Sequence, residues 1–252
     1  MKPRHLTLAV LQLLTGAAVI CAPLQSVPAA SAILRDTEDS NALILTAEIA
    51  LQRDDCGRAA ANYTLAAQHL SDAKLAQRAT GVALDCGQYQ AAERAAARWR
   101  QLTPTDPAAL RAAMRAELGL YKIDDARSAF EGWIKSGGGV GADKSSASAA
   151  AGAGPADENF AEQVGQVAQE SGVSATLAML RGAQAAPLQS GRAQLVLADL
   201  AFDGWNYREA LQYGQRALSA GAERAPTQLL LARAHAGLGE ADQAVAAAGA
   251  AR

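Results

Sequence analysis

Histidine and cysteine are the side chains that most often carry out chemistry near neutral pH, and this sequence contains few of them. Its 252 residues include three histidines and three cysteines. His5 lies in the first segment of the chain, and His69 and His235 lie far apart in alanine-rich segments of helical pattern. The sequence has no G-x-S-x-G, H-E-x-x-H or G-x-x-x-x-G-K-[ST] pattern. Because catalysis needs a nucleophile, a base and a group that stabilises charge, we expect a protein that is not an enzyme and that binds no metal or other cofactor.

Two pairs of adjacent aspartates, Asp54-Asp55 and Asp124-Asp125, offer the carboxylate oxygens that calcium and magnesium prefer. Each pair supplies only two carboxylates, fewer than a calcium-binding loop needs. Both pairs stand where a turn leads into a helix, and there an aspartate side chain can accept hydrogen bonds from the first backbone N–H groups. We therefore interpret both pairs as helix caps.

The segment 1–32 has the pattern of a secretory signal peptide. Lys2 and Arg4 precede an apolar run over positions 6–20, and small residues follow up to Ala32, where we expect cleavage. The apolar run is shorter than the roughly 20 residues that a membrane-spanning helix needs. We therefore expect a periplasmic or secreted protein. An outer-membrane lipoprotein with a lipid on Cys21 is the alternative, and the bulky Ile20 before that cysteine argues against it.

Cys56 and Cys86 remain after removal of the segment 1–32. Neither belongs to a C-x-x-C pattern and no histidine is near either of them in sequence, so the pattern indicates neither a redox centre nor a zinc site. An even pair of cysteines in an exported chain is usually a disulfide. The alternative is a pair of buried free thiols that pack as small apolar side chains.

The composition predicts an all-helical protein. Half of the residues are hydrophobic, mostly alanine and leucine, but only 4% are aromatic. This is too apolar for a disordered chain, and too poor in aromatic and β-branched residues for a β-sandwich. A net charge of −2 gives no electrostatic footprint for nucleic acid.

Four of the few aromatic residues fall at turns or between repeated segments. They are Tyr63, Trp99, Trp133 and Trp205. Large aromatic side chains at such positions usually pack between helices, and we expect a packing role for all four. Stacking against a ligand is the alternative.

A repeated pattern of turn, alanine and helix divides the sequence into units. Ala59, Ala92 and Ala126 follow turn-like segments, as do Ala210 and Ala244, and within each set the spacing is about 34 residues. Positions 136–156 are rich in glycine, serine and alanine and are predicted to be a flexible, disordered insertion. Without positions 137–155 the remaining distance fits about two repeats, with an intermediate key alanine at Ala178. We expect about six helix hairpins, three over positions 33–135 and three over positions 157–252.

The repeat resembles the tetratricopeptide repeat (TPR) family. The resemblance rests on Gly87-Gln88-Tyr89 with Ala92 and Pro104, and on Asn206-Tyr207-Arg208-Glu209-Ala210 with Leu218. It implies an all-α, right-handed α-solenoid that acts as a scaffold for protein or peptide partners. The segments 47–53 and 78–84 also look like the amino-terminal part of periplasmic TPR proteins. These include an outer-membrane lipoprotein that acts as an adaptor for a carboxyl-terminal processing protease, which implies such a protease and its substrates as partners.

In TPR solenoids the first helix of each hairpin lines the binding groove. Carried over to this sequence, that register points to Asn41, Glu48, Lys74, Gln77, Arg111, Arg115, Arg192, Asp199 and Arg233. Arg111 and Arg115 are one helical turn apart and share a helical face, where they could clamp a carboxylate of a peptide. The alternative is an ordinary solvated face. Two other functions stay open at this point, a non-catalytic part of a longer envelope enzyme and a structural module that oligomerises through its last helix.

Overall fold

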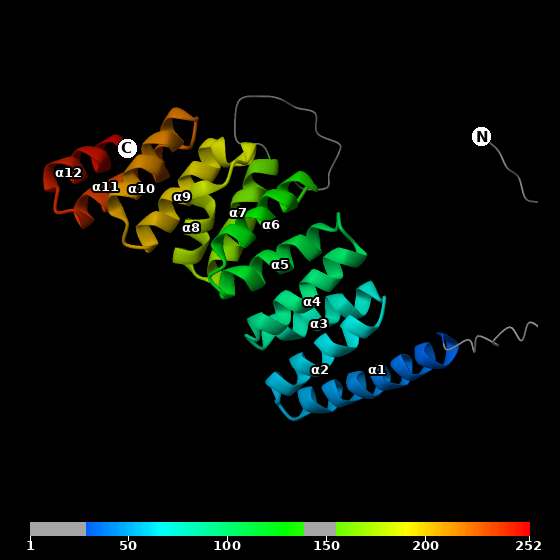
Figure 1. Cartoon of the computed structure of the whole chain (residues 1–252). Coiled ribbons are helices and arrows are strands. Elements are labelled where there is room, and N and C mark those ends of the chain that lie inside the picture. Colours follow the sequence, from blue (N-terminus) through cyan, green and yellow to red (C-terminus); the bar gives the residue numbers. More distant parts are fainter. Residues whose placement is uncertain (1–28, 139–154) are drawn as a thin grey trace, which may run out of the picture.

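The computed structural model describes residues 29–138 and 155–252, and within these ranges the chain forms twelve α-helices, one short 3-10 helix and no strand. The α-helices form six consecutive hairpins (Figure 1). Their bounds are α1 (Ala29–Gln52) with α2 (Cys56–His69), α3 (Ala73–Asp85) with α4 (Tyr89–Leu102), α5 (Pro107–Gly119) with α6 (Ile123–Lys135), α7 (Pro155–Ser171) with α8 (Val173–Gly182), α9 (Gly191–Asp203) with α10 (Tyr207–Ser219), and α11 (Arg224–Gly237) with α12 (Ala241–Ala250). The 3-10 helix η1 (Ala186–Gln189) connects α8 to α9.

The hairpins stack in chain order, from α1 and α2 at one end to α11 and α12 at the other (Figure 1). The second helix of each hairpin packs against the first helix of the next, except between α6 and α7. Serial stacking of this kind buries one face of each unit against its neighbour. The predicted all-α, TPR-like solenoid of six hairpins is therefore confirmed.

Each hairpin turns at one residue with a left-handed backbone. These residues are Asp54, Gly87, Tyr121, Gly172, Trp205 and Gly239. Glycine adopts this conformation without steric cost, whereas Tyr121 and Trp205 hold it at φ values of 57° and 61°, an uncommon state for bulky side chains. The predicted packing role of Trp205 is wrong, because this turn leaves 79% of the residue exposed.

The fourth residue of the second helix is small in all six hairpins of the described chain, and in the last hairpin it is the half-buried Ala244. Ala59, Ala92, Ala126 and Ala210 hold this position and are fully buried. Alanine allows helix axes to approach closely, which explains the repeated pattern. In the fourth hairpin Gly172 is itself the N-cap of α8, and the equivalent residue is Thr176, whose N–H donates a hydrogen bond to the carbonyl of Gly172 and which is fully buried. The predicted position Ala178 is therefore wrong by two positions along the chain.

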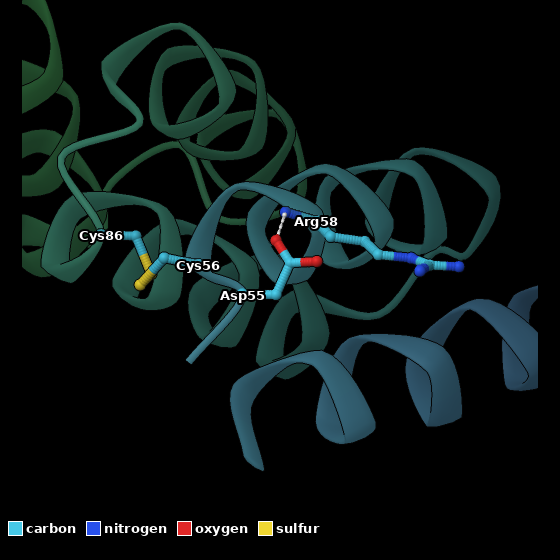
Figure 2. Close-up of a disulfide and its surroundings, with 4 residues drawn as sticks. All are labelled: Asp55, Cys56, Arg58 and Cys86. Carbon is cyan, nitrogen blue, oxygen red and sulfur yellow. Dashed lines mark hydrogen bonds between the residues drawn. A yellow bond between two sulfur atoms is a disulfide. The ribbon is translucent and has the colours of Figure 1, made fainter. Parts of the chain in front are cut away.

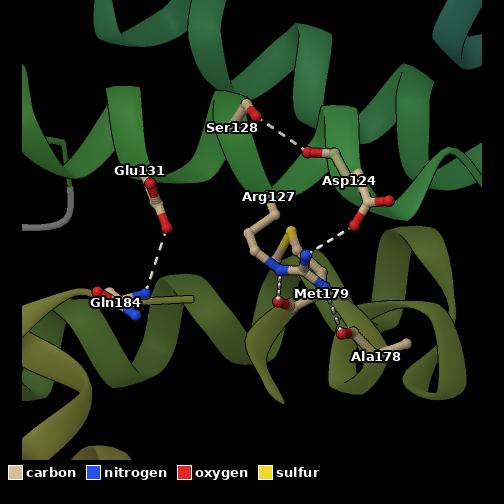
Figure 3. Close-up of polar contacts among 7 residues, drawn as sticks. All are labelled: Asp124, Arg127, Ser128, Glu131, Ala178, Met179 and Gln184. Carbon is tan, nitrogen blue, oxygen red and sulfur yellow. Dashed lines mark hydrogen bonds and ion pairs between the residues drawn. The ribbon is translucent and has the colours of Figure 1, made fainter. Parts of the chain in front are cut away.

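The fourth hairpin also stacks differently, because α6 packs against α8 instead of α7. Arg127 of α6 donates hydrogen bonds from Nε to the carbonyl of Met179 (3.1 Å) and from Nη2 to the carbonyl of Ala178 (3.4 Å), as Figure 3 shows. A Cβ atom at Gly182 would lie 2.6 Å from the Arg127 guanidinium, so glycine leaves room for this contact. Helix α7 packs against α5, α8 and α9 instead.

The core is built from alanines with a few large side chains among them. Tyr63, Trp99, Phe130, Trp133 and Phe160 are buried, as the sequence predicted for Tyr63 and the two tryptophans. One group of buried residues spans mainly hairpins one and two, and another spans hairpins three to six. Each hairpin is thus held by its neighbours and not by one central core.

Two predictions about the turns can be compared with the structure. Cys56, the first residue of α2, and Cys86, just after α3, form a disulfide with their Cα atoms 5.4 Å apart (Figure 2), which confirms the predicted bridge. Asp55 caps α2 by accepting a hydrogen bond from the backbone N–H of Arg58 (3.2 Å), as predicted, whereas Asp54 is the turn residue and not the cap. The capping role of Asp124-Asp125 is wrong, because both residues lie inside the first turn of α6, where their charge is favourable at the positive end of the helix dipole.

Some predictions fall wholly or mainly outside the described residues. Cys21 and most of the predicted signal peptide are among residues 1–28, and most of the predicted insertion is among residues 139–154. Helix α1 begins at Ala29, so the predicted cleavage position after Ala32 lies in its first turns. Among the described helices, none combines the length and the apolar character needed to cross a membrane.

Candidate peptide-binding groove

A pocket of about 260 Å³ lies between the first helices of hairpins two and three. It is lined by Gln77, Thr80, Gly81 and Leu84 of α3, Trp99 of α4, and Ala108, Arg111, Ala112 and Arg115 of α5. Three of the nine predicted groove residues, Gln77, Arg111 and Arg115, therefore meet in one place. The lining combines apolar surface with two cations, and none of the described residues in it is a histidine, a cysteine or a carboxylate.

Local sequence signals fix the two helices that form the pocket. Asp72 caps α3 by accepting hydrogen bonds from the backbone N–H groups of Lys74 (2.8 Å) and Leu75 (3.3 Å). Asp106 caps α5 through the backbone N–H of Ala108 (2.9 Å), and Pro107 is the first residue of that helix. Proline is favoured there because it has no N–H to leave unpaired. The start of α5 is thus defined, and with it the face that carries its two arginines.

The arginine pair of α5 already holds a carboxylate of the same chain. Arg115 Nε lies 2.9 Å from Glu170 Oε2, and Arg111 Nη2 lies 3.6 Å from the same oxygen. Arg111 Nη2 also donates a hydrogen bond to Gln166 Oε1 (3.1 Å). Both partners belong to α7, and the three charged side chains are 29–34% exposed. The pair is therefore neither a freely solvated face nor a fully buried ion pair.

A second group of predicted groove residues gathers near the other end of the array. Desolvation raises the pKa of the Asp199 carboxyl, the carboxylate of Asp203 raises it further, and Arg233 and Arg192 counteract this. Arg233 of α11 also lies over the ring of Phe202, with its guanidinium carbon 4.2 Å from the ring centroid. Three predicted residues of α9 and α11 thus share one electrostatic environment.

The remaining predicted residues do not join either group. Glu48 accepts a hydrogen bond from the hydroxyl of Tyr63 and pairs with Arg78 at 3.7 Å, so it links the first three helices. Asn41 and Lys74 lie at exposed positions of α1 and α3. The nine residues therefore form no single site, and three of them, Gln77, Arg111 and Arg115, meet apolar surface in the pocket between α3 and α5.

Sequence reasoning missed the α7 residues that contact the arginine pair and placed Trp99 outside the groove. Trp99 was predicted to pack between helices, with ligand stacking as the alternative, and it is buried and also lines the pocket. Gln166 and Glu170 contact Arg111 from far along the sequence, with the predicted insertion in between. Gln166 and Glu170 are one helical turn apart in the sequence, but this spacing does not identify the residue that they contact.

The two histidines in the described part of the chain take no part in the pocket. His69 is exposed on α2, and His235 Nδ1 lies 2.6 Å from Glu240 Oε2 at the turn between α11 and α12. Within the described ranges, no three histidine, cysteine or acidic side chains come together as metal ligands. The arrangement of the pocket suits binding by charge and apolar contact.

Comparison with known proteins gives no family. No protein-family model matches the sequence, and no curated protein matches it. Among solved structures, the chain shows similarity to the MamA protein (TM-score 0.34, 12% identity, 85% of this chain and 90% of that chain). It also shows similarity to PilF of Pseudomonas aeruginosa (0.34, 16%, 84% and 90%) and to the TPR domain of P58(IPK) (0.33, 13%, 83% and 58%). These similarities are weak, and the TPR-like fold rests on the geometry of the stacked hairpins.

Proposed function

We propose that this protein is an exported, non-catalytic scaffold that binds an extended segment of a partner protein in the pocket between α3 and α5. The observation that carries the proposal is the convergence of Gln77, Arg111 and Arg115 on a pocket with Trp99 and Leu84 in its wall. Apolar surface with a few well-placed polar groups is the usual composition of a binding pocket. Arginine suits carboxylate recognition because its N–H groups match the two oxygens.

A protein partner fits this pocket better than a small substrate. The pocket is part of a serial array of helices, and arrays of this type offer extended surfaces along which a chain makes many contacts. A side chain of the partner would enter between α3 and α5 while its backbone follows the neighbouring helices. Export rests on the pattern of the segment 1–32, and presentation of substrates to a carboxyl-terminal processing protease rests on the likeness of segments 47–53 and 78–84.

The test uses a variant that fills the pocket without opening the fold. Gly81 lines the pocket, and an added Cβ atom there would meet no atom within 4 Å. We therefore expect Gly81→Leu to remain folded and to place its side chain in the pocket. Gly57→Leu is the matched control, because Gly57 also lies in a helix with open space around its Cβ position and does not line the pocket.

Partner proteins would be captured from an envelope extract of the source cells with wild-type, Gly81→Leu and Gly57→Leu protein. We expect the same proteins to be recovered with wild type and Gly57→Leu. Recovery should fall at least about tenfold with Gly81→Leu, because its side chain occupies the pocket; tenfold corresponds to roughly 1.4 kcal/mol of binding energy. Circular dichroism melting of each variant checks the fold. Equal recovery with Gly81→Leu would remove the pocket from the proposal. A processing protease among the captured proteins would support the adaptor role.

A further inference from the structure

We infer that Glu170 is an internal ligand of the arginine pair, so that a partner carboxylate binds the pocket in competition with Glu170. This inference rests on the proposed function of the pocket, and it adds the chemistry of the ligand and a control over its binding. The ligand would be an acidic peptide segment. Binding of this segment would be regulated by the position of the Glu170 side chain of α7.

The geometry around Glu170 is that of a bound carboxylate. Two guanidinium groups from consecutive turns of α5 approach the same oxygen, Oε2, at 2.9 Å and 3.6 Å. The same two arginines of α5 also line the pocket between α3 and α5. A carboxylate that enters the pocket would therefore meet donors that Glu170 already occupies in part.

Electrostatics makes the two carboxylates competitors. Glu170 lies close enough to both arginines to neutralise part of their charge, and a second carboxylate bound beside them would be repelled by the first. The contact of Glu170 is one-sided, through a single oxygen, and the groups involved are about one third exposed. Ion pairs of this exposure contribute little to stability, so a partner can displace Glu170 at low cost.

The fold does not depend on this contact. Helix α7 is held by buried apolar side chains, among them Phe160, Val164 and Val167, which are 1–4% exposed. Loss of the Glu170 charge therefore leaves α7 in place. Glu170→Gln is the suitable variant, because glutamine keeps an oxygen that can accept a hydrogen bond from Arg115 but removes the negative charge.

Binding would be measured by fluorescence anisotropy on the full chain with a fluorescein-labelled tetraglutamate peptide that has a free α-carboxylate. A tetraglutamine peptide with an amidated end serves as the uncharged probe. We expect Glu170→Gln to bind tetraglutamate about fivefold more tightly than wild type, the size of effect expected for an exposed ion pair. Arg111→Ala combined with Arg115→Ala should abolish this binding, and tetraglutamine should distinguish none of the variants.

Glu162→Gln is the matched control, because Glu162 lies on the same helix two turns earlier, about 12 Å along the axis. At that separation salt screens most of its effect, so we expect affinity within about twofold of wild type. If Glu170 only positions the arginines, Glu170→Gln binds tetraglutamate equally or more weakly, and this overturns the inference. Absence of tetraglutamate binding by Glu170→Gln overturns it as well.

The proposed function fails or stands by a different result. Capture that is lost in Gly81→Leu and kept in Gly57→Leu supports the pocket as a partner site, whatever Glu170→Gln does with the peptide. Capture that is insensitive to Gly81→Leu removes the pocket function even where tetraglutamate binds the arginine pair. The two experiments together therefore show which of the two proposals is at fault.

Discussion

Glu117 is a carboxylate held in a poorly solvated place between α4, α5 and α6. Its side chain is 10% exposed, its Oε1 lies 3.8 Å from Arg100 Nη1, and its Oε2 is buried without a hydrogen-bond partner among the described residues. Burial raises the pKa of Glu117 to about 7 against the opposing effect of Arg100, and the carboxylates of Asp125 and Glu93 also raise it. Lys122 counteracts part of this increase. The folded protein therefore keeps a proton on the Glu117 carboxyl at pH values well above its ordinary pKa of 4.5.

This pKa predicts a fall in stability as pH rises. The folded-state pKa is about 7 and the ordinary value is 4.5, so between these values the folded state binds a proton that the unfolded state releases. The free energy of unfolding then decreases with pH over this interval. Glu117→Gln should remove about 2 kcal/mol of the difference in unfolding free energy between pH 5 and pH 8. Urea unfolding at both pH values measures it. A pH dependence in Glu117→Gln equal to that of wild type and of Glu162→Gln would contradict this assignment.

At the scale of the helix pair, the crossing position decides how closely two helices approach. Ala92 is the fully buried fourth residue of α4, and Thr176 is the equivalent, fully buried residue of α8, although α7 and α8 contact each other less extensively than the helices of the other hairpins. Both hairpins thus hold a small residue at this position, and the large buried Leu177 is the next residue of α8. We therefore expect a preference for a small side chain at the crossing position and for a large one at the core position that follows it in α8.

Substitution in each direction tests this preference. Ala92→Leu overpacks a tight crossing and should lower the free energy of unfolding by about 2 kcal/mol. Leu177→Ala leaves a cavity and should lower it by about 3 kcal/mol. Ala97→Leu is the control, because Ala97 is an exposed residue of α4, and it should change stability by less than about 0.5 kcal/mol. Urea unfolding gives the three values, and a neutral Ala92→Leu would be incompatible with the close crossing.

The sequence was sufficient to predict the helix hairpins, but it was insufficient to predict which residues of different hairpins contact each other. The period of about 34 residues identified the hairpins, because each one repeats the same short-range pattern of turn and alanine. The search for alanine selected Ala178 instead of Thr176, because the fourth hairpin holds a threonine at the repeated position and α8 begins directly after Gly172. The contact of Glu170 with the arginine pair depends on how α7 packs after the stacking change at α6, and no local pattern encodes that packing.

At the scale of the whole array, stability is expected to be distributed hairpin by hairpin. A stacked array gains stability from each unit and from each interface between neighbours, so its ends can open without the middle. Hairpins one and two share most of one group of buried residues, which includes Tyr63 and Trp99, and the larger group lies over hairpins three to six. The disulfide between Cys56 and Cys86 links the turns of the first two hairpins to each other.

This location predicts a local effect of reduction. The two cysteines are 30 positions apart in sequence, and loss of the bridge should lower the stability of the first two hairpins by about 3 kcal/mol through the entropy of the unfolded segment. Hydrogen–deuterium exchange of the oxidised protein and of the Cys56→Ser, Cys86→Ser double variant would measure it. We expect faster exchange in α1 to α4 and unchanged exchange in α9 to α12. Faster exchange over the whole chain would show that the array unfolds as one cooperative unit, and no change in α1 to α4 would show that stacking on hairpin three already holds this end.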